Sequence, residues 1–175
     1  MKATDLFLSV ILCLFMFGCN KLCSDEKLSM QREDYVGNEL RVDGYYYIQD
    51  EKHQNTSIKF LYQNGIILTG GGYSGTDLNV VEAEMVKVYS EIRKHKNHWG
   101  VFSITNDQIL TEAWDDPLGG CSLPTVKCRG YIQNDTTFHI VESYFSNTKK
   151  TYYSDKVWYF KQFFNKPDST NNFIK

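Results

Sequence analysis

The stretch IKFLYQNGIILTG, residues 58–70, contains two strand-like runs separated by Asn64-Gly65. Asn-Gly is a strong short-range signal for a β-hairpin, because both residues tolerate the positive φ that a tight turn requires. The arrangement recurs at Asn106-Asp107 in VFSITNDQIL and at Asn134-Asp135 in RGYIQNDTTFHIV. Three tight hairpins predict antiparallel pairing between strands that are neighbours in the sequence.

Aromatic, strand-prone segments flank these hairpins: GYYYIQ at 44–49 and TYYSDKVWYFKQFF from residue 151. The predicted strand cores are 44–49, 57–63, 66–70, 99–104, 108–114, 125–132, 136–145 and 155–163. About eight antiparallel strands in a meander predict a mainly β fold, either an up-and-down barrel or a strongly curved sheet. A closed barrel leaves no strand edge exposed, which protects an exported protein from aggregation.

One helix is expected between the third and fourth strands, over about residues 77–96. Its apolar residues recur in steps of three and four, which places them on one helix face. They are Leu78, Val81, Met85, Val88 and Ile92. Asp77 or Thr76 can cap the start, because a short oxygen side chain accepts a hydrogen bond from the first free amides.

Gly70, Gly72 and Gly75 match the G-x-G-x-x-G spacing of a dinucleotide-binding loop. That loop belongs to a parallel βαβ unit, with its third glycine already inside the helix. Here the preceding strand is the second arm of a hairpin, and the helical pattern starts after Gly75. The glycines are therefore expected to let the chain leave a strand and turn into the helix.

Composition sets the class of protein. A chain of 175 residues with 42% hydrophobic and 15% aromatic residues is long enough and apolar enough for one folded domain with a core. The formal net charge is -2, from 19 basic and 21 acidic residues. Because nucleic-acid binders usually present a basic face, no nucleic-acid partner is expected.

The N-terminus indicates export. Lys2 precedes an apolar run from Leu6 to Phe17, which is shorter than the roughly 20 residues of a membrane-spanning helix and fits a secretory signal. Gly18-Cys19 follows and resembles the lipobox of bacterial lipoproteins, which implies cleavage before Cys19 and lipidation of that residue. The alternatives are an ordinary signal peptide cleaved elsewhere and an uncleaved anchor.

The expected organisation has four parts: a signal peptide at 1–18, a lipidated polar tether at 19–33, a β-rich domain at 34–165 and a polar tail at 166–175. The chain as a whole resembles small uncharacterised lipoproteins of Bacteroidota-type bacteria. The shared features are Gly18-Cys19, GYYY at 44–47, WGVFSI at 99–104 and NDTTF at 134–138. This resemblance implies a lipocalin-like architecture and a place in the cell envelope, with Cys19 anchored in a bacterial outer membrane.

The cysteines are compatible with an oxidising compartment. Cys121 and Cys128 lie in CSLPTVKC, where a local disulfide is expected after export. Cys23 is then either a free thiol or a rival partner. In the alternative, Cys128 is a small buried strand residue without a bridge.

Strand aromatics supply candidate pocket residues, because alternate side chains of a small barrel face its interior. They could bind an apolar or glycan ligand, or they could fill the core, as is usual in protein interiors. The candidates are Tyr46, Phe60, Tyr62, Phe102, Trp114, Phe138 and Trp158. His95 and His98 form an incomplete metal site, so neither a metal nor another cofactor is expected.

The sequence thus predicts a lipid-anchored envelope module that binds a small ligand or a protein partner, and it shows no catalytic motif. The alternative is an envelope or glycan hydrolase that uses paired carboxylates. Such a pair must face across a cleft at about 5–9 Å. The candidate carboxylates are Asp115, Asp116, Glu112 and Glu142.

Overall fold

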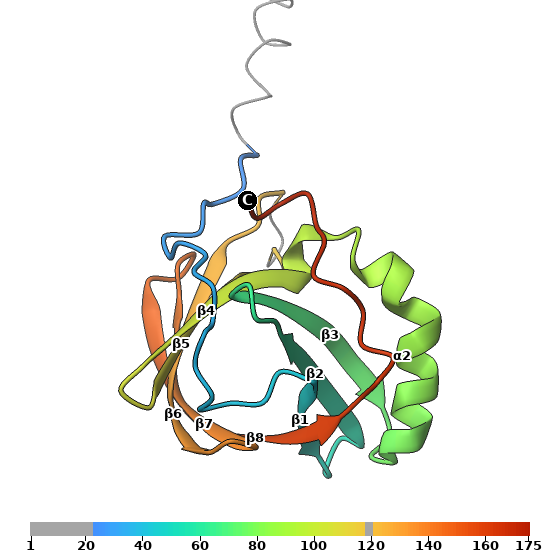
Figure 1. Cartoon of the computed structure of the whole chain (residues 1–175). Coiled ribbons are helices and arrows are strands. Elements are labelled where there is room, and N and C mark those ends of the chain that lie inside the picture. Colours follow the sequence, from blue (N-terminus) through green and yellow to red (C-terminus); the bar gives the residue numbers. More distant parts are fainter. Residues whose placement is uncertain (1–22, 118–120) are drawn as a thin grey trace, which may run out of the picture.

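The computed structural model describes residues 23–117 and 121–175. Its eight strands pair in sequence order, each antiparallel to the next, and β1 pairs with β8 to close a barrel (Figure 1). The strands are β1 Gly44–Asp50, β2 Asn55–Leu61, β3 Ile66–Ser74, β4 Trp99–Thr105, β5 Gln108–Trp114, β6 Thr125–Asn134, β7 Thr137–Phe145 and β8 Lys150–Gln162. The predicted mainly β meander is confirmed, and it takes the closed form.

The predicted hairpins form at the expected turns. Gly65, Asn106 and Asp107 have positive φ values of 73°, 50° and 60°, as their turns require. At Gly65 a Cβ atom would lie 2.0 Å from the backbone oxygen of Glu33. Glycine at this turn therefore also permits the close approach of the chain that precedes the barrel.

Helix α2, Leu78–Ile92, lies outside the barrel between β3 and β4 (Figure 1). Asp77 caps it by accepting a hydrogen bond of 2.9 Å from the backbone amide of Asn79. The helix buries Val81 and Met85. It ends before the expected residue 96, and the short helix η2, Lys96–His98, leads into β4.

The glycine motif has the predicted structural role. Gly70 and Gly72 lie within β3, and β3 is antiparallel to both β2 and β4. Gly75, with φ of 93°, follows the strand before α2. The parallel βαβ unit of a dinucleotide site is therefore not formed here.

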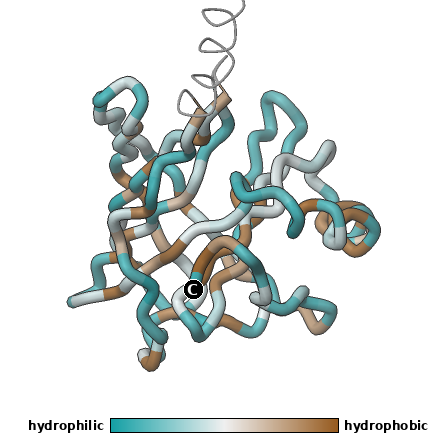
Figure 2. The backbone as a smooth tube through the Cα atoms, turned by 90° about the horizontal axis from the view of Figure 1, so that it is seen from above, coloured by the Kyte–Doolittle hydropathy of each residue, from teal (hydrophilic) through white to brown (hydrophobic). Residues whose placement is uncertain are grey.

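Successive side chains of a strand point to opposite faces of the barrel wall, which divides the apolar side chains into two cores. Figure 2 shows hydrophobic and hydrophilic residues alternating along parts of the chain. The outer core lies between the barrel and α2. It includes Tyr45, Ile58, Phe60, Tyr62, Leu68, Val81, Met85, Trp99 and Trp114. The inner core fills part of the barrel. It consists of Leu40, Tyr46, Leu61, Ile67, Phe102, Ile109, Phe138, Ile140 and Trp158.

The chain before β1 covers one end of the barrel, which we call the closed end. The β2–β3, β4–β5 and β6–β7 turns lie at this end. Leu40 is buried in the inner core, and the ring of Tyr35 packs on Phe102 with centroids 5.6 Å apart. The Tyr46 hydroxyl donates to the backbone oxygens of Arg41 and Asp135, at 3.1 Å each. These contacts fix the covering segment against the turns of that end.

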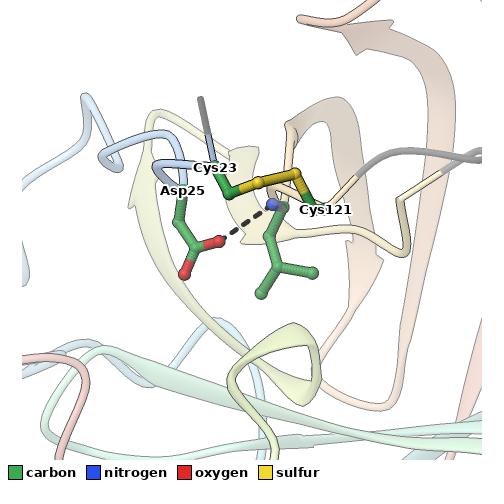
Figure 3. The surroundings of a disulfide bond; sticks show 4 residues. Cys23, Asp25 and Cys121 are labelled. Atoms are coloured by element: carbon green, nitrogen blue, oxygen red, sulfur yellow. Dashed lines mark hydrogen bonds between the residues drawn. A yellow bond between two sulfur atoms is a disulfide. The ribbon is translucent and has the colours of Figure 1, made fainter. Parts of the chain in front are cut away.

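Residues 23–33, which we call the N-terminal strap, are attached to the outside of the domain. A disulfide joins Cys23 to Cys121, with Cα atoms 5.3 Å apart (Figure 3). The expected Cys121–Cys128 disulfide is therefore wrong. Cys128 remains a thiol because it lies within β6 and packs against the inner core, whereas Cys121 lies in the loop before that strand.

Polar contacts hold the strap along its length. The Asp25 carboxylate accepts from the Leu123 amide at 2.9 Å (Figure 3), and that bond is the main reason why the pKa of Asp25 is lowered. The Trp114 indole donates to the backbone oxygen of Glu26 at 2.6 Å. From Cys23 onward the strap therefore packs against the β domain.

The C-terminal segment also packs on the domain. Phe173 and Ile174 lie against the outer core, and the Lys166 amine donates to the backbone oxygens of Val42 and Leu61, at 2.6 Å each. Within residues 23–117 and 121–175, no helix has the length and apolarity needed to cross a membrane.

Candidate functional site: the open end of the barrel

The inner face of the barrel becomes polar away from the closed end. On β2, Ile58 and Phe60 belong to the outer core, so the side chain of Lys59 points inward. Its amine lies 5.2 Å from the ring centroid of Trp158 in the inner core. On β8, Lys156 pairs in register with the inward-facing Ile140. The amines of Lys59 and Lys156 thus lie beyond the inner core, toward the other end of the barrel.

That other end, which we call the open end, carries the β1–β2 turn, the β5–β6 connection and the β7–β8 turn. One pocket there has a volume of about 410 Å³. It is lined by Ser143, Phe145, Asn147, Thr148, Tyr152, Tyr153, Ser154 and Lys156. A second pocket of about 510 Å³ is lined by Ile48, Gln49, Asp50, Glu51, Asn55, Ser57 and Lys156. Lys156 belongs to both pockets and places them at one site.

Lys59 is a partly buried cation. Burial lowers its pKa, and the charge of Lys156 lowers it further, whereas Cys128 and Asp115 act in the opposite direction. In the described part of the chain, neither Lys59 nor Lys156 forms an ion pair with an acid. Both lysines of the open end thus lack a direct acidic partner among the described residues.

Hydroxyl and thiol groups lie beside these amines. The Ser154 Oγ atom is buried and has no hydrogen-bond partner within the described residues. The Cys128 Sγ atom lies 3.3 Å from the Ser143 Oγ atom. Since a buried hydroxyl usually has a partner in native proteins, Ser154 is available to a molecule that enters the pocket.

The candidate pocket aromatics do not line one pocket. Tyr46, Phe102, Phe138 and Trp158 belong to the inner core. Phe60, Tyr62 and Trp114 belong to the outer core. All seven are buried, so they mainly fill cores, as the sequence-based alternative proposed. Trp158 is connected to the open end through its contact with Lys59.

The sequence-based prediction does not include the two lysines. The sequence did contain a signal at position 59, since IKFL places a lysine between two apolar residues of a strand with apolar residues on both faces. A charged residue there must either point outward or mark an unusual interior. Lys156 gave no comparable signal, because SDKVW is compatible with an exposed strand face.

The candidate carboxylates have structural partners. Glu112 is 1% exposed and accepts hydrogen bonds from the backbone amides of Ser29 and Met30. Glu142 forms a bidentate pair with Arg129 across β6 and β7. Glu112 thus faces the strap and Glu142 faces Arg129, so the structure does not bring these two acids together across a pocket.

The remaining candidates are also held locally. The Asp116 carboxylate accepts a hydrogen bond from the Asn97 amide group, and the Asp115 backbone amide donates to Pro124. His98 contacts the backbone oxygen of Thr69 through Nδ1 at 2.9 Å. No group of three or more metal-ligating side chains occurs among residues 23–117 and 121–175.

A larger pocket, of about 690 Å³, lies on the outside between the strap and the C-terminal segment. Three of its cations, Lys27, Arg32 and Lys175, are exposed to solvent. Lys96 forms an ion pair with Asp25 at 2.9 Å and lies 4.4 Å from the ring centroid of Trp114. The open end is the better candidate site, because Lys59 points into the barrel interior there, whereas Lys27, Arg32 and Lys175 lie exposed on the outside.

The fold and the site define a closed eight-stranded β-barrel that is covered at one end and carries Lys59 and Lys156 on its inner face toward the other. No family model matches the chain, and no curated protein or solved structure shows significant similarity to it.

Proposed function

We propose that this chain is an exported, lipid-anchored envelope protein that binds a small ligand in the open end of its barrel. The difference between the two barrel ends carries the proposal. Leu40 and the chain around it cover the closed end, whereas pockets that share Lys156 occupy the open end. Pockets of several hundred cubic ångströms are typical of small-molecule sites.

The disulfide supports the export step. A bridge between Cys23 and Cys121 is stable in an oxidising compartment and uncommon in a reducing one. It also occupies Cys23, which leaves Cys19 as the cysteine that directly follows the apolar run. This agrees with lipidation at Cys19 of the Gly18-Cys19 sequence.

The strap determines how far the barrel can lie from the anchor. Only residues 20–22 separate Cys19 from the disulfide-bonded Cys23. An extended chain spans about 3.3–3.6 Å per residue, so Cys23 would lie within roughly 15 Å of the lipidated residue. The proposed arrangement is a barrel held close to the membrane surface.

Intact mass spectrometry of membrane fractions tests the anchor. We expect the wild-type mass to equal a chain that starts at Cys19 plus acyl groups, and we expect Cys19→Ala to lose that species. A soluble wild-type protein without lipid would contradict the anchor. Native mass spectrometry of the same protein tests the binding role, since a retained small molecule should dissociate on unfolding.

A further inference from the structure

We infer that the ligand of the open end is an anion attached to an apolar, aromatic body, and that Lys59 and Lys156 bind its negative group. This inference rests on the proposed binding role of that end and specifies the chemical class of the ligand. A carboxylate, a sulfonate and a phosphate monoester share the chemistry required.

The position of Lys59 is the first support. Removing an ammonium group from water is costly unless an anion or hydrogen-bond acceptors compensate it. The Trp158 ring compensates part of this cost through a cation–π contact at 5.2 Å. Within the described residues no hydrogen bond or ion pair adds to it, so part of this cost is left for a bound anion to offset.

The second support is the pairing of Lys59 with Lys156, whose charge disfavours the charged form of Lys59. Two like charges near each other repel, and a bound anion would relieve that repulsion. Acids also lie near the rim. Asp50 is paired with His53 at 2.6 Å, Glu51 lines the second pocket with Lys156, and Asp115 favours the charged form of Lys59. Among the described residues none of these acids forms an ion pair with either lysine.

The pocket walls beside Lys156 suit an aromatic body. In the pocket of about 410 Å³, Phe145 and Tyr152 pack edge to face with centroids 5.5 Å apart. The unpartnered hydroxyl of Ser154 lies in the same pocket, next to Lys156 along β8. A hydroxyl donor beside an amine matches the several acceptor oxygens of a carboxylate, sulfonate or phosphate.

A matched pair of fluorescent probes tests the inference. Anilinonaphthalene sulfonate carries an anionic group, and phenylnaphthylamine has the same ring system without it. Both are titrated against the folded protein, with four variants: Lys59→Met, Lys156→Met, Lys87→Met and Ser154→Phe. Lys87 is an exposed lysine of α2 and serves as the matched control for charge.

We expect the sulfonate to bind about tenfold or more tightly than the neutral probe. The neutral probe lacks one charge-assisted contact that the sulfonate makes. Lys59→Met and Lys156→Met should each remove most of that difference, and Lys87→Met should leave it unchanged. Ser154→Phe should weaken the binding of both probes, because the larger side chain fills the pocket.

Two outcomes separate this inference from the proposed function. If both probes bind equally and neither lysine variant changes the ratio, the anion inference is wrong and the binding role stands. If neither probe binds, or if Ser154→Phe leaves binding intact, the open end is not the ligand site.

Thermal unfolding monitors the fold, and Lys59→Met should raise the melting temperature because it removes a partly buried charge. The exposed Lys156 provides a variant that does not alter the core.

Discussion

The buried carboxylate of Glu112, on β5, accepts a hydrogen bond of 2.6 Å from the backbone amide of Met30 in the strap. The amide of Ser29 donates to the same oxygen at 2.7 Å, and the Lys127 amine lies 3.8 Å from the other oxygen. One side chain therefore satisfies two backbone donors of a segment that has no regular secondary structure. The strap is positioned by the barrel wall.

Replacing Glu112 with alanine should destabilise the protein by about 2–3 kcal/mol, because two backbone donors of the strap lose a charged acceptor. Urea denaturation measures the change in the free energy of unfolding. Glu84→Ala on the exposed face of α2 is the matched control and should change it by less than about 0.5 kcal/mol. Equal effects of both substitutions would contradict the role assigned to Glu112.

The Cys23–Cys121 disulfide joins residues 98 positions apart. In the chain-entropy account, a loop of this size stabilises by up to about 4–5 kcal/mol, so Cys23→Ser should lower the melting temperature strongly. Cys128→Ser should have a smaller effect. Peptide mapping without reduction should recover the Cys23 and Cys121 peptides linked to each other. Recovery of a Cys121–Cys128 link would refute the pairing.

Lys166 should make stability depend on pH. Burial lowers its pKa from 10.5 to about 8, so between these values the unfolded chain binds more protons than the folded one. Stability should therefore rise with pH in this window and fall as the pH drops through 8. The gain between pH 7 and 9.5 should reach at most about 2 kcal/mol.

The Lys166→Met variant isolates this contribution, since the difference between the two proteins cancels the titration of other groups. Measurements should stay below pH 10, where buried tyrosines such as Tyr62, whose pKa is raised by burial, begin to oppose the trend. A flat difference in unfolding free energy from pH 7 to 9.5 would show that Lys166 is not desolvated in the folded state.

Alanine substitutions at Gly65 and Gly71 distinguish the cost of backbone strain from the cost of a steric clash. Both have positive φ, at 73° and 77°, but only at Gly65 would a Cβ atom meet the Glu33 backbone oxygen, at 2.0 Å. Gly71→Ala should cost about 1 kcal/mol from strained backbone alone, and Gly65→Ala about 2 kcal/mol or more. Equal losses on thermal unfolding would mean that the chain before the barrel does not press on this turn.

The fold could be predicted because its signals are local. Asn-Gly and Asn-Asp turns set the pairing of neighbouring strands, and the stripe from Leu78 to Ile92 identified α2. The outer core was harder to foresee, because strands with apolar residues on both faces do not show which face is inside. Phe60 and Trp114 were consequently assigned to the interior, although α2, the strap or the C-terminal segment covers the outer face on which they lie.

The site and the disulfide were less predictable for a different reason. Both depend on contacts between residues far apart in the sequence, such as Lys59 with Trp158 and Cys23 with Cys121. Short spacing favoured Cys128 as the partner of Cys121, but β6 directs that side chain against the inner core. Only the closed topology brings β2 and β8 near enough for Lys59 and Lys156 to affect each other.

The most direct test of the central claim is an NMR titration of the isotope-labelled protein with anilinonaphthalene sulfonate. We predict that the shifted amide signals belong to the open end, around Lys59, Cys128, Ser154 and Lys156, while those around Leu40 at the closed end stay fixed. Shifts confined to the closed end, or to the outer face beneath α2, would contradict the account.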